Sequence, residues 1–265
     1  MNEIVQDERG QITILTLNRA ELGNALTPAM LTRLGELVAA FDADPVQKVL
    51  VIRGAGEKAF CSGVDLSVML DEMGTGSFVP MSRAPDMAGL AACKKPVIAA
   101  INGLAVGGGM EIAMCCDIRI AVDNAWFALP EAGHGFIAGV AAVLMPRLLP
   151  LGMVMDMMLA GERLSAAEAL RHGFVQKIVR PDALMNETLA KAERIATFSQ
   201  PALWGTKQAL RFWHDAWKAE HHRHYEAIVH RVMLAGDMDE GLKAFRERRK
   251  PVFTRGEWPN PFGKK

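Results

Sequence analysis

A glycine run followed closely by a glutamate is the part of this chain with the clearest chemical meaning. Gly107, Gly108 and Gly109 end an apolar segment, and Glu111 follows two positions later. Glycines let a backbone bend sharply and approach a ligand closely. A helix that begins at such a bend points its free N–H groups and the positive end of its dipole back toward it, which favours negative charge there. The combination predicts acid–base chemistry on a carbonyl whose oxygen becomes negative.

Two other segments supply groups that suit the same chemistry. Ala59–Leu66 is typical of a strand end that breaks at Gly63, and Phe127–Glu131 brings a second carboxylate 20 residues beyond Glu111. Each has an ordinary structural interpretation on its own, because glycine runs are usually turns and Glu131 suits a helix start. Together they predict two turns with backbone donors beside two carboxylates, which is what general acid–base catalysis next to an oxyanion requires.

Other interpretations of these residues fail on spacing. A Walker A loop needs Lys-Ser/Thr after Gly108, and a dinucleotide-binding fingerprint needs glycine or alanine where Ile112 stands. Glu131 and His134 form a Glu-x-x-His pair, but glycines on both sides of the histidine disfavour the helix that a metal pair needs. We therefore expect neither a nucleotide cofactor nor a metal.

Short apolar strands and helices alternate around these residues. Thr27 before Pro28 predicts a helix start, with an apolar period that continues to Asp42, and Ser165 with Glu168 forms a capping box for another helix. This alternation predicts an α/β layered domain. Strands are expected at 11–18, 49–52, 96–101, 118–122 and 175–179.

The chain changes character after residue 180. From Pro181 onward the apolar pattern is helical, with no further strand expected. A boundary near Ser199–Pro201 would divide the chain into a β-containing core at 1–199 and a helical region at 200–265.

Composition excludes several classes of protein. Half of the 265 residues are hydrophobic, so a large core is expected, and the balance of 30 acidic and 30 basic residues argues against a nucleic-acid binder. Uncharged runs are shorter than the roughly 18–20 apolar residues of a membrane span, and the start of the chain has no signal-peptide pattern. Four cysteines without C-x-x-C spacing are typical of reduced thiols in a cytoplasmic protein.

Taken together, the motifs resemble the crotonase superfamily, the enoyl-CoA hydratase/isomerase family. The resemblance implies a spiral of repeated ββα units at 1–199 that holds the active site, followed at 200–265 by a helical trimerisation region, with trimers paired into hexamers. The matching stretches run over nearly the whole chain in family order: Asn18-Arg19, Asn24–Leu26, Lys58–Asp65, Lys95–Gly103, Gly107–Glu111, Cys116–Ile118, Phe127 with Pro130-Glu131, Leu159–Glu162, and Ala244-Phe245 with Arg248–Lys250.

The resemblance also implies a substrate and roles for individual residues. Family members hold an acyl-CoA thioester with its carbonyl oxygen between two backbone N–H groups, which by motif position are those of Val64 and Gly108. In a hydratase Glu111 would activate the water that adds at Cβ, and Glu131 would deliver the proton to Cα. Mutual repulsion and partial burial would raise the pKa of one of them. No cofactor is expected, since coenzyme A is part of the substrate. Further substrate and CoA contacts are expected from Ala25, Ser62, Asp65, Leu66, Gly107 and Arg248.

Alternatives stay open at this point. An isomerase of the family usually needs only the Glu131-type carboxylate, and a lyase, hydrolase or dehalogenase can share the scaffold. An RNA-binding relative carries a lysine comb on its first helix, whereas Arg33 is the one basic residue between Thr27 and Asp42.

The acyl group is also open, because the chain departs from the familiar hydratase pattern after Glu131. Ala138 and Ala141-Ala142 stand where many relatives have a proline and a glycine pair. Four methionines in the variable segment are either ordinary packing or part of a pliable acyl pocket: Met69, Met73, Met81 and Met87.

Overall fold

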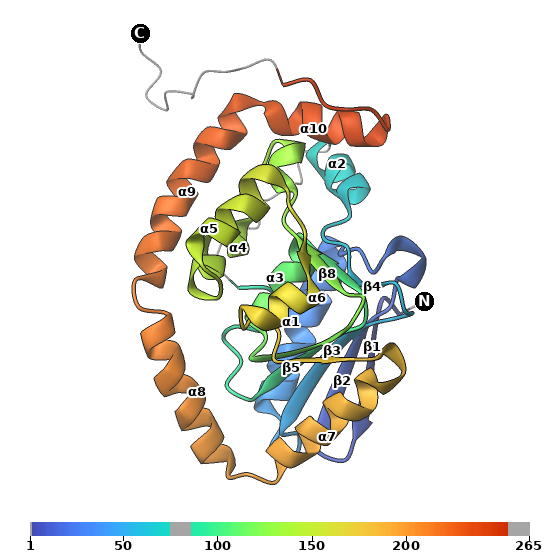
Figure 1. Ribbon diagram of the computed structural model, residues 1–265, viewed down its shortest axis with the longest axis vertical. Helices are drawn as coiled ribbons and strands as arrows, with labels where there is room; N and C mark the ends of the chain where they lie inside the picture. Colours follow the sequence, from blue (N-terminus) through green and yellow to red (C-terminus); the bar gives the residue numbers. More distant parts are fainter. Residues whose placement is uncertain (1, 75–85, 254–265) are drawn as a thin grey trace.

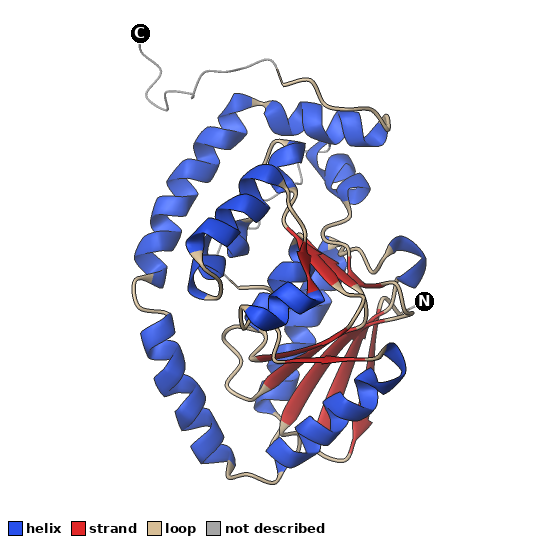
Figure 2. Ribbon diagram, viewed as in Figure 1, coloured by secondary structure: helices blue, strands red, loops and turns tan. Residues whose placement is uncertain are grey.

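Two β-sheets lie at the centre of the protein, whose computed structural model describes residues 2–74 and 86–253. Figure 2 shows the strands gathered at the centre with helices around them. The strands are β1 (Ile4–Arg9), β2 (Ile12–Leu17), β3 (Val49–Gly54), β4 (Ala59–Cys61), β5 (Val97–Ile101), β6 (Leu104–Val106), β7 (Ile118–Val122), β8 (Trp126–Ala128), β9 (Leu164–Ser165) and β10 (Lys177–Val179). The larger sheet has the order β1-β2-β3-β5-β7-β10 and the smaller one β4-β6-β8-β9.

The helices cover these sheets and then continue as an arm. The α-helices are α1 (Pro28–Ala43), α2 (Leu66–Gly74), α3 (Gly108–Cys115), α4 (Gly139–Leu144), α5 (Leu151–Met155), α6 (Ala166–Arg171), α7 (Leu184–Ala196), α8 (Gln200–His214), α9 (Lys218–Ala235) and α10 (Asp237–Arg246). Short 3-10 helices are η1 (Ala20–Leu22), η2 (Glu131–His134), η3 (Met145–Arg147) and η5 (Pro181–Ala183), and η4 (Asp156–Ala160) is a π-helix. Among the described residues no helix is both long enough and apolar enough to cross a bilayer.

Successive strand pairs form a spiral, in which each pair contributes one strand to each sheet. The first strand of each pair, β3, β5 or β7, joins the larger sheet in parallel, and the second, β4, β6 or β8, joins the smaller sheet in parallel. A helix follows each pair: α2, α3 and then η2. This arrangement confirms the ββα spiral that the resemblance implies, and it brings the ends of β4, β6 and β8 to one side of the smaller sheet.

The sequence predicts the long strands well and the short ones poorly. Strands β2, β3, β5, β7 and β10 confirm the expected segments. Strands β6 and β8 have three residues each and β9 has two, which is too few to show a period. Strand β1 exposes all but its first residue, so it lacks the apolar alternation of a half-buried strand.

Local capping signals fix the helix starts. The Thr27 hydroxyl accepts the N–H of Met30 at the start of α1, and the capping box at Ser165 is complete at the start of α6. Buried apolar residues repeat along α1 at helical spacing, and α7 packs on β3, β5 and β7. Both sheets therefore sit in a continuous apolar core.

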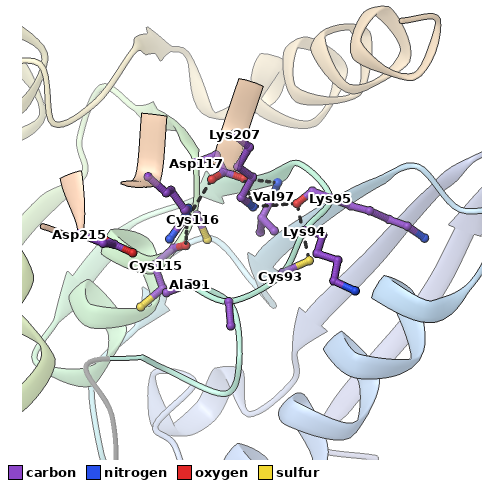
Figure 3. Close-up of polar contacts among 12 residues, drawn as sticks. Ala91, Cys93, Lys94, Lys95, Val97, Cys115, Cys116, Asp117, Lys207 and Asp215 are labelled. Carbon is purple, nitrogen blue, oxygen red and sulfur yellow. Dashed lines mark hydrogen bonds and ion pairs between the residues drawn. The ribbon is translucent and has the colours of Figure 1, made fainter. Parts of the chain in front are cut away.

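One partly buried aspartate fastens the helical arm to this core. Asp117 accepts the N–H of Val97 (2.8 Å), the Lys207 ammonium (2.6 Å) and the Arg211 guanidinium (2.9 Å), and Lys207 also donates to the carbonyl of Lys95 (2.8 Å). Figure 3 shows Lys207 reaching into this cluster from α8. From this anchor α8 and α9 continue as a curved arm along one side of the molecule, and α10 returns against α2 and η2 (Figure 1).

Candidate active site

A cavity of about 450 Å³ lies where the spiral meets the returning helices. Its lining comes from the turns after β4 and β6, from η2 and α4, and from α9 and α10. Most of the surface is apolar. Among the described residues, the polar side chains in this lining are Ser62, Glu111, Glu131, His134 and Tyr225. An apolar cavity with a few converging polar groups is the usual form of a small-molecule site.

Val64 and Gly108, the residues of the two predicted backbone donors, both line this cavity. In the bridge between Leu26 and Val64, the Leu26 N–H donates to Gly63 O and the Asp65 N–H donates to Leu26 O, both at 2.8 Å, so the Val64 N–H faces the opposite side. Gly108 is the first residue of α3, where N–H groups lack intrahelical acceptors. A β-carbon on Gly108 would lie 3.6 Å from the Val64 nitrogen. The two predicted oxyanion donors are therefore neighbours.

Two glycines of the run make this close approach possible. Gly107 has a φ of 52°, and a β-carbon there would come within 2.8 Å of Glu131 Oε1. A β-carbon on Gly109 would lie 2.1 Å from the carbonyl oxygen of Cys61 in β4. Any larger residue at either position would displace the carboxylate or separate α3 from the sheet.

The two glutamates are buried in different surroundings. Glu111, in the first turn of α3, accepts the N–H of Ala141 on Oε1 at 3.0 Å. Glu131, the first residue of η2, has a buried Oε2 with no hydrogen-bond partner within the described part of the chain. A buried acceptor without a partner is unusual in a folded protein. It is expected where a ligand or a proton belongs.

Burial raises the pKa of both carboxyl groups. It is the main cause of the rise of the Glu131 pKa to about 8, and the nearby Glu111 charge adds to it. For Glu111, burial raises the pKa while N–H groups of Ala141 and Val140 oppose the rise. The sequence predicted repulsion and partial burial that raise one pKa; the repulsion acts on Glu131 as expected, while burial is nearly complete and raises the pKa of both groups. Because backbone donors support a charge on Glu111, we infer that a single shared proton resides on Glu131.

The other predicted contacts divide into two groups. Ser62, Leu66 and Gly107 line the cavity. Ala25 and Asp65 are not part of its lining, and both contact Arg19: the Ala25 carbonyl accepts from its guanidinium at 2.7 Å and Asp65 forms an ion pair at 3.0 Å. These two residues hold the turn that carries Val64, and a contact with substrate stays a prediction for them.

Arg248 is an exposed cation just after α10, followed by Arg249 and Lys250. The two neighbouring arginines are already paired: Arg246 contacts Asp71 at 2.7 Å, and Arg249 contacts Glu240 at 2.5 Å. Arg248 itself forms no ion pair with any residue that the structure describes. Its side chain is thus available for an external anion.

Sequence reasoning missed the contribution of the last two helices to the cavity. Tyr225, Val229 and Met233 of α9 and Met238 of α10 all line it. A signal was present, since the first three recur every four residues and so share one helix face. What the sequence does not show is which part of the spiral that face contacts.

Two of the four methionines singled out from the sequence also reach the cavity. Met69 and Met87 line it. Met81 lies outside the described residues, and the side chain of Met73 is not described. His134 is half-buried in the lining, between the rings of Phe136 and Phe245, and burial lowers its pKa.

Nucleophilic and metal chemistry have little support in the site. Burial raises the pKa of the Cys61 thiol to about 12, so it is a packed thiol and not a nucleophile. No group of three or more His, Cys, Asp or Glu side chains is placed to hold a metal ion in residues 2–74 and 86–253.

Known proteins are similar to this chain in both fold and sequence. The sequence profile of the family described as enoyl-CoA hydratase/isomerase matches residues 7–256. (E)-Benzylidenesuccinyl-CoA hydratase of Thauera aromatica is 39% identical over 244 residues, which cover 91% of this chain and 95% of that protein. Crotonyl-CoA hydratase of Syntrophomonas wolfei is 35% identical over 256 residues, covering 94% and 97%. The crystal structure of carnitinyl-CoA hydratase from Mycobacterium avium matches with a TM-score of 0.84 at 31% identity, covering 96% of this chain and 99% of that one.

Fold and site together define a crotonase-type enzyme that acts on acyl-CoA thioesters. The chain belongs to the enoyl-CoA hydratase/isomerase family.

Proposed function

We propose that this protein is an enoyl-CoA hydratase, which adds water across the Cα=Cβ bond of an enoyl-CoA thioester. The observation that carries the proposal is the arrangement of two buried carboxyl groups beside the backbone N–H groups of Val64 and Gly108. Glu111 is supported as a carboxylate by the Ala141 N–H, whereas Glu131 has an unpartnered oxygen and a pKa raised by burial to about 8. At neutral pH the site therefore holds one base and one acid.

The reaction follows from these positions. The thioester oxygen accepts hydrogen bonds from Val64 and Gly108, and each such donor is worth roughly 3–4 kcal/mol when negative charge develops on the oxygen. Glu111 takes a proton from water as the water oxygen bonds to Cβ, and the electrons of the double bond move onto the thioester as an enolate. Glu131 then gives its proton to Cα. Proton balance is restored when the proton on Glu111 returns to Glu131 through solvent.

The presence of Glu111 supports hydration over isomerisation. Moving a double bond needs one group that removes and returns protons, and Glu131 alone can do this. A second carboxylate, held in place by a backbone N–H at 3.0 Å, is needed to activate water.

Variants of the two glutamates test this assignment. E111Q and E131Q should each lower kcat for hydration by about 10²-fold or more, with a modest effect on substrate affinity, because each handles a different proton. The measurement is loss of the conjugated thioester absorbance across a panel of enoyl-CoA esters. Glu193, an exposed residue of α7, provides the matched control E193Q. Near-normal hydration by E111Q would contradict the hydratase assignment and favour an isomerase.

The same proposal includes the oligomeric state and the cellular location of the enzyme. Leu210, Phe212 and Trp217 are exposed on the helical arm, which supports a homotrimer, or a pair of trimers, built through residues 200–265 on a catalytic core at 1–199. All four cysteines are free and buried, which supports a reducing, cytoplasmic location. Arg33 pairs with Glu36 at 2.8 Å, so the first helix gives no support to RNA binding.

A further inference from the structure

Tyr225 brings a third polar group to the glutamate pair. It is the only tyrosine in the chain, it lies on α9, and it lines the cavity although it is 7% exposed. Its ring stacks on that of His222 with centroids 6.1 Å apart, which fixes the direction of the side chain. The hydroxyl forms no hydrogen bond with any residue that the structure describes. Because Tyr225 lines the cavity, this hydroxyl can hydrogen-bond a molecule that enters it.

The hydroxyl lies on the Glu111 side of the site. A β-carbon on Gly139, the first residue of α4, would be 2.9 Å from Tyr225 Oη. Two residues later the Ala141 N–H holds Glu111 Oε1 at 3.0 Å. Both side chains therefore converge on the first turn of α4. Glu131 instead lies against Gly107, beside the oxyanion donors.

This placement matches what the attacking water needs. Water that attacks Cβ gives one proton to Glu111, and its second O–H is oriented best by an acceptor on the protein. A neutral phenol offers acceptor lone pairs and one donor. Burial, together with the charges of Glu111 and Glu131, raises the pKa of Tyr225, so the phenol stays neutral in the working pH range.

We propose that Tyr225 is a positioning residue for hydration: its hydroxyl and the Glu111 carboxylate hold the attacking water from two sides. The inference rests on the proposed hydratase function and adds to it a group that the family motifs do not contain. Gly139 leaves room for this hydroxyl, since a side chain at that position would occupy the space of the hydroxyl.

Two reactions of the same active site separate this role from a structural one. The first is hydration of the best enoyl-CoA in the panel. The second is exchange of the α-protons of the corresponding saturated acyl-CoA in D2O, followed by mass spectrometry. Exchange needs the oxyanion donors and Glu131, which removes a proton and returns a deuteron, but it needs no water at Cβ. Y225F keeps the ring and removes only the hydroxyl.

We expect Y225F to lower kcat for hydration by about 10- to 10²-fold, as misplaced reactants do. KM and the exchange rate should stay within about twofold of wild type. The double variant Y225F/E111Q should lose little more than E111Q alone, because the two residues act on one water. The control V229A, one turn along α9 in the same lining, should change KM and leave the ratio of hydration to exchange unchanged.

Other outcomes overturn the proposal in distinguishable ways. Equal losses of hydration and exchange in Y225F would show a structural role, and unchanged hydration would show no role. Either result leaves the hydratase assignment standing. A wild-type enzyme that exchanges α-protons but hydrates no member of the panel would overturn the hydratase function and this inference together.

Discussion

In the proposed mechanism, the proton on Glu131 sets the pH range in which hydration can occur. Burial raises the pKa of this carboxyl to about 8, so the group is an acid below that pH and loses its proton above it. Hydration requires the protonated form, because Glu131 supplies the proton to Cα. The reverse dehydration requires the same single proton, then placed on Glu111. Because the overall reaction takes up and releases no proton, the two directions should respond to pH in the same way.

We therefore expect kcat/KM for hydration and for dehydration to fall together, by about tenfold per pH unit above pH 8, so that their ratio stays constant. Steady-state rates of both directions from pH 6 to 10 measure this. E131Q, which has no proton to lose at this position, should not show this fall in its residual activity. A wild-type hydration rate that is constant up to pH 10 would contradict the role of Glu131 as the acid.

Arg248 provides a second prediction for a single residue. Coenzyme A carries phosphate groups, and a charge-assisted contact to one of them is typically worth enough to change affinity roughly tenfold. R248A should raise KM for acyl-CoA by about that factor and leave kcat nearly intact, since the contact is remote from the reacting carbons. The same variant should behave like wild type with a pantetheine thioester, which lacks the nucleotide.

Arg246 supplies the matched control for this test. It has the same charge two residues earlier, but Asp71 already binds it at 2.7 Å. R246A should therefore affect KM less than R248A does. Equal effects of R248A on acyl-CoA and on the pantetheine thioester would indicate that Arg248 supports structure and does not bind phosphate.

At the residue scale, motifs predicted the groups that the spiral itself positions. Val64, Gly108, Glu111 and Glu131 each sit at a strand end or helix start that the sequence marks with glycine or proline, and the structure brings them together. Tyr225 could not be predicted as part of the site. Its place depends on the contact of α9 with α4, two helices separated by more than 70 residues, and that contact leaves no local sequence mark.

Among the elements, α10 depends on one glycine for its contact with the catalytic turn. A β-carbon on Gly241 would lie 2.0 Å from the carbonyl oxygen of His134, the last residue of η2. G241A must therefore push α10 away from the turn that begins with Glu131. We expect a destabilisation of about 1–3 kcal/mol, typical of overpacking, together with lower kcat for hydration.

Gly205 gives this prediction its control. It lies within α8, and a β-carbon there would meet no atom within 4 Å. G205A should leave activity unchanged and raise stability by roughly 0.5–1 kcal/mol, since alanine is the better helix former. Urea denaturation and hydration kinetics of both variants provide the comparison. If the two alanine variants behave alike, α10 does not control the geometry of η2.

Among helices and strands, the sequence predicts the long periodic elements but not the short ones. Capped helices and strands of five or more residues in the larger sheet have enough periodicity to be recognised, as α1, α6, β3 and β5 illustrate. The smaller sheet is built from strands of two or three residues whose pairing arises only because the spiral stacks them. The smaller sheet therefore depends on tertiary structure. The resemblance to a known family predicts it, whereas the local sequence pattern does not.

For the whole molecule, the apolar surface of the arm predicts assembly. Phe212 is 85% exposed and Trp217 is 80% exposed in the isolated chain, values that large apolar side chains of a lone monomer rarely reach together. Light scattering at micromolar concentration and moderate salt should give three or six times the 28.9 kDa mass of the chain. F212D should shift the mass toward that of one chain, because it places a charge in the proposed interface. A wild-type protein with the mass of a monomer would contradict the proposal.

The position of α10 in the chain also sets the order in which the enzyme is completed during synthesis. Both glutamates and both oxyanion amides precede residue 132, but Met238 and Leu242, which pack beside Met69 at the cavity, come more than 100 residues later. At about 5–20 residues per second, a ribosome needs roughly 6–23 seconds to travel from Glu131 to Arg246. A nascent chain thus contains both glutamates well before the helices that complete the cavity lining have been made, and we expect that apolar lining to be accessible to chaperones in the interval.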